Sequence, residues 1–299
     1  MVDNFYHGYT VPTPVTDGKH VFALFGSGII AALDFDGNIV WREELPRLKD
    51  VDGGICSSPV LYEDSVIIPS IEKTGLRALV KATGKVKWEQ QSRDQNRMST
   101  PALIRIGDRV QLIHYAGGIQ GLDPSTGMLL WFCRGITSGQ SSPVFGSGLL
   151  YTDAGRGGQF GNVVDATGTG DVSKTHVKWK AKATTAGGSS GIVVGDYIYR
   201  GSEPGLIRCR ELASGEIAYE ERTPGIDPGA SPIACANGRI YFASPNKSYV
   251  IKADPKFELL ATNDLGDGPY TTPAISNGRI FIKGKSYLWC IATKQVSTP

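Results

Sequence analysis

Residues 99–131, STPALIRIGDRVQLIHYAGGIQGLDPSTGMLLW, contain one complete unit of a repeat that runs along the chain. The unit opens with Ser99-Thr100-Pro101 and closes with Trp131, and Gly-Asp, Gly-Gly and Ser-Thr-Gly turns separate its short apolar runs. Turn residues at these places divide the unit into four short strands. We therefore expect a four-stranded antiparallel sheet, with strands at 99–103, 109–115, 119–123 and from 128 onward.

The start of this unit recurs at a nearly fixed interval. Ser or Thr followed by Pro, or by Gly in one copy, begins seven repeats that are 41 to 48 residues apart, at Pro14, Pro59, Pro101, Pro143, Gly191, Pro232 and Pro273. A period in the low forties built of four short strands is typical of a β-propeller. The sequence therefore predicts an all-β, seven-bladed β-propeller of four-stranded antiparallel blades. It would be a single domain over 1–299, with repeats at approximately 12–45, 57–92, 99–135, 141–182, 189–223, 230–263 and 271–291.

The last repeat, 271–291, has no clear fourth strand. Residues 1–11 precede the first repeat, and we expect them to supply that strand and close the propeller, because an open blade would keep a long unpaired edge. The alternative is an incomplete eight-bladed propeller, in which the missing blade leaves a gap or favours self-association. The sequence leaves the oligomeric state undetermined.

A tryptophan follows the turn glycine by four positions in several repeats. Trp41, Trp88 and Trp131 hold this position in the first three repeats, Tyr219 holds it in the fifth, and Trp179 comes late in the fourth repeat, which carries an insertion. A large aromatic side chain at a fixed place in each repeat fills the wedge between neighbouring blades. We therefore expect these residues to be structural.

Composition argues against several classes of protein. The formal net charge is +2 and no basic run is interleaved with aromatic residues, so nucleic acid is not an expected partner. No stretch approaches the roughly 18 apolar residues of a transmembrane helix. The N-terminal residues show no signal peptide, so the protein is cytosolic or its leader has been removed. Five cysteines lack the spacing of a disulfide framework or a zinc site.

Ala78–Trp88 (ALVKATGKVKW) and Gly121–Trp131 (GLDPSTGMLLW) resemble the pyrroloquinoline-quinone (PQQ) repeat. The resemblance covers essentially the whole chain. It extends to bacterial PQQ-binding-like propellers, to the propeller of the outer-membrane assembly lipoprotein and to quinoprotein dehydrogenases, and it implies an exported or periplasmic bacterial protein. The resemblance implies PQQ held beside an adjacent Cys-Cys disulfide and a calcium ion held by Glu, Asn and Asp. This chain lacks adjacent cysteines and a recognisable set of this kind, so we expect no cofactor.

The loops after the fourth strand and between the second and third strands of each repeat gather on one face of a propeller, around its funnel. We take as candidate ligand-binding residues the charged members of these loops: His7, Asp94, Arg97, Asp153, Arg156, Arg200, Glu203, Lys247 and Lys285. The cations come from five repeats, and together they would attract an anion or an acidic peptide. The alternative is that these cations do not converge and are solvated loop charges, balanced by Asp94, Asp153 and Glu203. His114 lies in a strand, so we expect a core or edge position for it.

No Gly-x-Ser-x-Gly, His-Glu-x-x-His or Cys-x-x-Cys motif is present, and no catalytic residue can be assigned. We therefore expect a non-catalytic binding or scaffold propeller. Its funnel face, or an exposed sheet edge, would meet a protein, a peptide or a small anionic ligand. The alternative is an enzyme that works in the funnel, either a PQQ-type dehydrogenase or a lyase or hydrolase with Ca²⁺ as an option.

Overall fold

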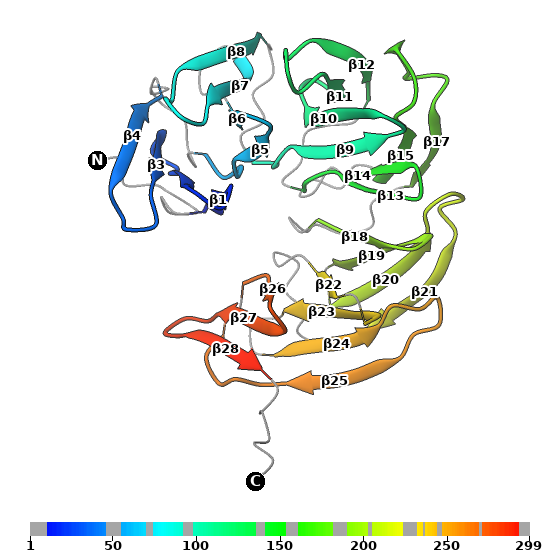
Figure 1. The fold of residues 1–299 in the computed structure, drawn as a ribbon. Helices are drawn as coiled ribbons and strands as arrows, with labels where there is room; N and C mark the ends of the chain where they lie inside the picture. The colour runs from blue at the N-terminus through cyan, green and yellow to red at the C-terminus, as the bar shows by residue number, and fades with distance from the viewer. Residues whose placement is uncertain are drawn as a thin grey trace. The chain divides into compact units, whose positions relative to one another are not determined.

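The computed structural model describes residues 11–45, 55–69, 74–91, 98–135, 141–153, 161–181, 190–202, 205–223, 232–235, 237–243, 247–268 and 271–292 (Figure 1). These residues form 28 strands in seven sheets, and no helix among them is long and apolar enough to cross a membrane. The sheets are the blades of the predicted all-β, seven-bladed propeller, which confirms the fold class.

The first three blades follow one another along the chain (Figure 1). Blade 1 consists of β1 (Val15–Thr16), β2 (Val21–Leu24), β3 (Ile29–Leu33) and β4 (Ile39–Glu44). Blade 2 consists of β5 (Val60–Tyr62), β6 (Ser65–Pro69), β7 (Thr74–Val80) and β8 (Val86–Gln91). Blade 3 consists of β9 (Ala102–Ile106), β10 (Arg109–Tyr115), β11 (Ile119–Leu122), β12 (Leu129–Cys133) and, as a fifth strand, β16 (Gly170–Asp171).

The remaining blades repeat the same order. Blade 4 consists of β13 (Val144–Gly146), β14 (Leu149–Thr152), β15 (Gly161–Asp165) and β17 (Val177–Ala181). Blade 5 consists of β18 (Ile192–Val194), β19 (Tyr197–Ser202), β20 (Leu206–Glu211) and β21 (Ile217–Arg222). Blade 6 consists of β22 (Ile233–Cys235), β23 (Arg239–Ala243), β24 (Ser248–Lys252) and β25 (Leu259–Asn263). Blade 7 has three described strands, β26 (Ala274–Ser276), β27 (Arg279–Lys283) and β28 (Leu288–Ala292).

The chain divides into two compact units, and the division passes through blade 4. Unit 1 comprises residues 1–143, 152–154 and 164–177, and unit 2 comprises residues 144–151, 155–163 and 178–299. The prediction of one domain over 1–299 stays a prediction. The predicted closing strand, residues 1–11, lies outside the described residues except for Val11, which is not in a strand.

The first strand of blade 3 starts later than the sequence pattern predicts. In blade 3 it begins at Ala102, because Pro101 has no N–H to donate to a ladder. Thr100, which precedes the proline, accepts instead through its hydroxyl Oγ1 from the N–H of Ser58 at 3.0 Å. Ser58 Oγ accepts from Thr13 N–H at 2.9 Å, and Ser142 Oγ accepts from Thr100 N–H at 3.0 Å. The Ser/Thr of the repeat therefore links blade to blade within unit 1.

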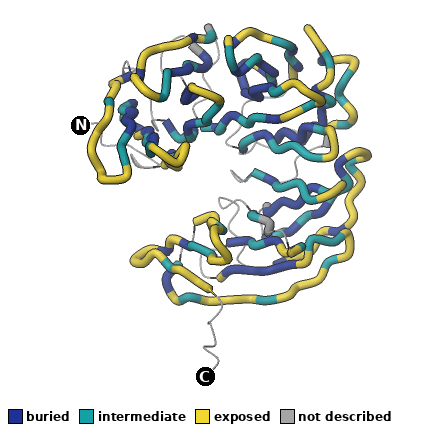
Figure 2. Tube along the Cα trace, in the orientation of Figure 1, coloured by how far each residue is buried: buried dark blue, intermediate teal, exposed yellow. Residues whose placement is uncertain are grey.

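Apolar side chains of adjacent blades form the core of each unit. Phe22 and Ile30 of blade 1 pack in one cluster with Val66 and Ile68 of blade 2, all fully buried. In unit 2, corresponding clusters join blade 4 to 5, blade 5 to 6 and blade 6 to 7. The middle strands of the blades are largely buried, whereas outer strands such as β4 and β25 are largely exposed (Figure 2).

Three of the recurrent tryptophans lock neighbouring blades, as predicted. The indole Nε1–H of Trp41 donates to Lys81 O at 2.7 Å, that of Trp88 to Pro124 O at 3.1 Å, and that of Trp179 to Leu212 O at 2.8 Å. Each acceptor lies in the turn between the third and fourth strands of the next blade. Each ring covers the glycine of that turn, where a Cβ would lie only 2.6–2.7 Å from ring atoms, as at Gly84, Gly127 and Gly215.

Trp131 is fully buried, but its indole makes a different hydrogen bond from those of the other three. Its Nε1–H donates to Oε1 of Gln111 in its own blade at 2.6 Å, and the Gln111 Nε2 in turn donates to Ala166 O of blade 4 at 3.1 Å. The reason is the insertion in blade 4, where residues 166–176 replace the short turn. Part of that insertion is β16, which pairs in parallel with β12 through Trp131↔Gly170 and Phe132↔Asp171.

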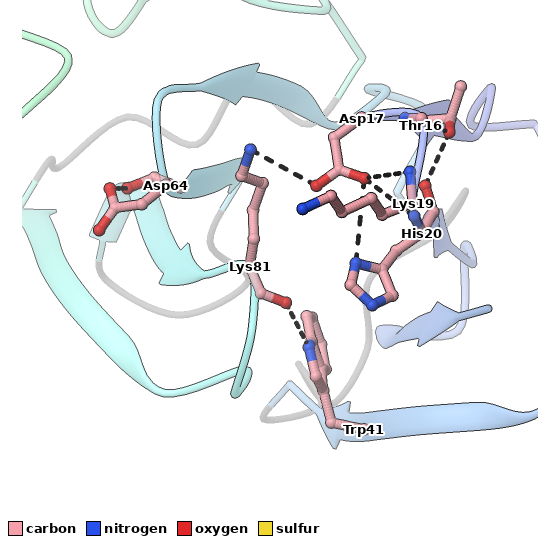
Figure 3. A network of polar contacts seen from close by, with 9 residues as sticks. Thr16, Asp17, Lys19, His20, Trp41, Asp64 and Lys81 are labelled. Carbon is pink, nitrogen blue, oxygen red and sulfur yellow. Dashed lines mark hydrogen bonds and ion pairs between the residues drawn. The ribbon is translucent and has the colours of Figure 1, made fainter.

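The junction of blades 1 and 2 shows how the regular turns interlock (Figure 3). The Nζ of Lys81 lies 3.5 Å from Oδ2 of Asp17, while its backbone O accepts from Trp41. The Oδ1 of Asp17 accepts from the N–H groups of Lys19 at 3.0 Å and His20 at 2.9 Å. The His20 amide is the largest cause that lowers the pKa of Asp17. Because each of these groups already has a partner in the turns, the network is structural.

Candidate functional site

The second strand of each blade ends at the loops where the sequence analysis places the site. In every blade, the residue after the motif proline or glycine pairs with one residue of the second strand, as Ala102 pairs with Ile113 in blade 3. These pairs define equivalent positions in the seven second strands. The next position of the second strand holds, in blade order, Ala23, Ile68, His114, Thr152, Arg200, Phe242 and Ile282. The position after that holds Leu24, Pro69, Tyr115, Asp153, Gly201, Ala243 and Lys283.

Polar side chains replace apolar ones at these positions mainly in the middle blades. In unit 1 they are His114, Tyr115, Thr152 and Asp153, which we call the strand-end cluster because they occupy the same two positions of the second strand in adjacent blades. All four side chains are buried, with exposed fractions of 0–2%. Other repeats have apolar residues at these positions, so the buried polar residues of blades 3 and 4 are not explained by packing and mark a candidate site.

His114 is the most unusual member of the cluster. Leu112 packs against Ile67 and Leu76 of blade 2, and His114, two residues further along β10, faces the same side. Neither ring nitrogen of His114 has a hydrogen-bond partner in the described part of the chain. Burial lowers the pKa of His114 from 6.5 to about 4, so the imidazole is neutral at pH 7.

Tyr115 faces blade 4, and Asp153 and Thr152 lie near it. Its hydroxyl donates to Asp153 O at 3.5 Å. Burial, and then the charge of Asp153, raise the pKa of Tyr115 well above its ordinary value of 10, although hydrogen bonds with the Asp153 backbone and the Thr152 side chain oppose them. The phenol therefore stays protonated. Neither His114 nor Tyr115 is tuned towards proton transfer near neutral pH.

Unit 2 holds the other described candidates. Arg200 lies in β19 opposite Arg208 and is 8% exposed. Lys247 precedes β24 and Lys285 lies in the β27–β28 turn, and both are exposed. The Lys285 amide donates to Asp267 O at 2.8 Å.

Five predicted site residues lie outside the described residues: His7, Asp94, Arg97, Arg156 and Glu203. Convergence of the cations therefore stays a prediction. From the sequence, Asp153 is a candidate site residue, His114 is expected only in the core or at an edge, and Thr152 is not a candidate. An alignment of the second strands could have grouped these residues, because it shows which repeats have a polar residue at a position that is apolar in other repeats.

The described residues do not fit a PQQ and calcium site. No group of three or more His, Cys, Asp or Glu residues among them is placed to hold a metal ion. The chain has no adjacent cysteines, and the described free cysteines are Cys56, Cys133, Cys209 and Cys290. The strand-end cluster offers one neutral imidazole and one carboxylate, which is not the donor set that the resemblance implies.

Comparisons with known proteins agree with the repeat. The sequence profile of a family described as "Outer membrane protein assembly factor BamB" matches residues 5–221. No curated protein sequence matches the chain.

Solved structures share the fold at low sequence identity. BamB from Moraxella catarrhalis is 18% identical, with a TM-score of 0.70, and the match covers 91% of this chain and 81% of that one. A quinohemoprotein alcohol dehydrogenase from Comamonas testosteroni is 13% identical, with a TM-score of 0.66 and coverage of 90% and 62%. A computationally designed protein, Ika8, is 12% identical, with a TM-score of 0.56 and coverage of 94% and 96%.

Proposed function

We propose, because the chain belongs to the family of outer membrane protein assembly factor BamB, that its propeller is a non-catalytic scaffold that binds other proteins. The observation that carries this proposal is the family match over residues 5–221, which contain the strands of blades 1 to 4 and nearly all of blade 5. As part of the same proposal, the protein acts in the periplasm of a bacterium.

The chemistry of the strand-end cluster supports binding over catalysis. A general acid or base works best when its pKa lies near the working pH and it reaches the proton that it moves. Burial holds His114 in its neutral form and Tyr115 in its protonated form, and both side chains are fully enclosed. Neither group is therefore suited to act as a general acid or base near neutral pH.

We place the binding surface on unit 2, on the loops between the second and third strands of its blades. Lys247 and Lys285 are exposed there, between the second and third strands of blades 6 and 7. Cations at these positions would favour a partner with acidic segments. The alternative is that the same surface binds a small anionic ligand.

Site-specific photo-crosslinking in the bacterial host tests this proposal. A photoreactive amino acid replaces Lys247, and in a second variant Lys285. The matched control is Lys256, which is exposed at the opposite end of β24 in blade 6. We expect covalent adducts with a protein from Lys247 and Lys285 and none from Lys256. Adducts from Lys256 alone, or from none of the three positions, would contradict the proposal.

A titration with PQQ and Ca²⁺ tests the enzymatic alternative. We expect no visible quinone band on the protein and no dye reduction with an alcohol as substrate. A bound quinone together with dye reduction would replace the scaffold by a quinoprotein dehydrogenase.

A further inference from the structure

Two glutamines form a polar contact in the junction of blades 2 and 3. Gln90 lies on β8, where it pairs with Leu76 of β7, and Gln120 lies on β11. The Nε2 of Gln90 donates to Oε1 of Gln120 at 2.9 Å. The core cluster that joins the two blades is otherwise built of apolar side chains such as Ile67, Leu76 and Leu112. The glutamine pair therefore interrupts an apolar junction.

His114 lies beside this pair. It is the Cα partner of Gln120 in the β10–β11 ladder, so the two side chains lie next to each other on the face of blade 3 that is turned to blade 2. The imidazole is 1% exposed, and both of its ring nitrogens are unpartnered in the described part of the chain. A buried side chain with two unpaired polar atoms therefore borders the glutamine pair.

Hydrogen bonds fix the direction of both amides. The Nε2 of Gln120 donates to Ala116 O at 3.1 Å, which leaves its Oε1 to face blade 2. That oxygen can only accept, so Gln90 approaches it with its Nε2. The Oε1 of Gln90 is then a buried acceptor that lacks a donor among the described residues. Three buried atoms of the junction therefore need a partner, namely this oxygen and the two nitrogens of His114.

These three atoms specify the chemistry of what they bind. A neutral imidazole has one N–H donor and one acceptor nitrogen, whereas an amide oxygen only accepts. The occupants must therefore accept from one ring nitrogen and donate to the other nitrogen and to Gln90 Oε1. A simple anion supplies no donor. A metal ion accepts no hydrogen bond, and the described residues place no group of three His, Cys, Asp or Glu to hold one. Water supplies donors and acceptors together.

We infer that the junction of blades 2 and 3 is an internal water site, with one water molecule on each ring nitrogen of His114. The two nitrogens lie on opposite edges of the ring, so a single water does not reach both. Because Gln120 adjoins His114 and binds Gln90, one of these waters also donates to Gln90 Oε1. Buried waters typically make about three hydrogen bonds to polar groups that have no other partner. Immobilising them costs less free energy than leaving these atoms unpaired.

The glutamines also provide a polar route to the site. β8 is the outer strand of blade 2, and Gln90 and Gln120 are partly exposed, whereas His114 is buried. A water that moves from the surface to the imidazole therefore passes amide groups. The site exchanges with bulk solvent while the two blades stay packed. Either tautomer of His114 is accommodated, because a water can donate or accept.

NMR of the full chain with isotope-labelled histidine tests the inference, because the chain has only four histidines. His114→Phe identifies the signals of the His114 ring. We expect cross-peaks between water and the carbon-bound ring protons of His114. Gln90→Leu removes one partner of one water and should reduce these cross-peaks by about half. The matched control is Gln111→Leu, whose amide is already partnered by Trp131 and Ala166, and which should leave them unchanged.

A crystal structure of the full chain gives the positions directly. We expect electron density for a water within hydrogen-bond distance of each ring nitrogen of His114. A ring nitrogen that bonds to a protein group or packs against carbon atoms would overturn the inference. Wild-type protein without the water cross-peaks, or an equal loss of them in Gln90→Leu and Gln111→Leu, would overturn it as well. Circular dichroism checks the fold of each variant, and the wild-type spectrum and crystal decide the matter if a variant is unfolded.

Discussion

The junction of blades 2 and 3 and the junction of blades 3 and 4 use the same residue type in two ways. Trp88 reaches forward, donates to Pro124 O and covers Gly127 of the next blade. Trp131 occupies the same place in the repeat but donates to Gln111 of its own blade. The first junction depends on a short glycine turn, and the second depends on a buried amide and an added strand, β16.

This difference shows where the repeat constrains the chain and where it does not. A docking tryptophan needs a turn with no side chain beneath the ring, which residues 166–176 do not provide. Where such a turn is missing, Gln111 accepts the hydrogen bond of the indole N–H and donates in turn to Ala166 O of blade 4. The strand-end cluster lies in the same two blades. The junctions with a docked tryptophan are therefore structural. The junction of blades 3 and 4 is where this protein differs from its own repeat.

The largest effect is expected at the docking glycines. Gly127→Ala should lower the free energy of unfolding by about 2–4 kcal/mol, because it combines positive-φ strain with a Cβ 2.6 Å from the Trp88 ring. The matched control is Gly37→Ala. It has a similar φ of +87° with no atom within 4 Å of the new Cβ, and should cost only about 1 kcal/mol. Urea unfolding measures both, and equal effects would mean that docking adds nothing.

A pH-dependent effect, absent at neutral pH, is expected from His114. Its pKa of about 4 in the folded state lies below the ordinary 6.5, so the unfolded chain binds the extra proton more readily. The stability that the neutral side chain contributes is therefore complete above pH 6.5 and is lost as the pH falls towards 4. The slope is at most about 1.4 kcal/mol per pH unit. Urea unfolding from pH 7 to 4 should show a weaker pH dependence in His114→Leu, and an unchanged dependence would contradict the assignment.

The smallest effect is expected from the hydroxyl links. Ser58→Ala removes the acceptor of the Thr13 N–H and should cost about 0.5–1.5 kcal/mol. Ser125→Ala is a suitable control, because Ser125 uses only its backbone N–H in the hydrogen bond to Asp123 Oδ1. A comparison of the two midpoints in urea measures the contribution of the hydroxyl, and no difference between them would contradict a link between blades.

The fold was predictable because its cause is local and repeated. Turn glycines recur along the chain, the motif proline recurs in six of the seven repeats and the tryptophan in four, and β10 matches its predicted bounds of 109–115. The hydroxyl links were not predictable, because a Ser or Thr before proline gives no sign of which distant amide it accepts from. The hydrogen bond of Trp131 to Gln111 depends on an insertion in the next repeat, residues 166–176, which the local pattern around Trp131 does not contain.

The candidate site was predictable only in part. Asp153 was named from its loop position, and the structure places it in a buried cluster with Tyr115. His114 was assigned to the core or an edge, and it is buried, yet its neighbours across blades depend on register and not on sequence distance. Arg200 is nearly buried, whereas Lys247 and Lys285 are exposed, a difference that residue type alone does not reveal.

Double-mutant cycles at the two kinds of junction measure the proposed difference most directly. Trp131→Phe should cost about 1–3 kcal/mol, because it leaves the buried Gln111 Oε1 without its donor, and this cost should largely disappear in a Gln111→Leu background. Trp41→Phe, which leaves the half-buried Lys81 carbonyl, should cost about 1 kcal/mol. Gln111→Leu should not change that cost. Additive effects of Trp131→Phe and Gln111→Leu would contradict the claim that this buried pair replaces turn docking between blades 3 and 4.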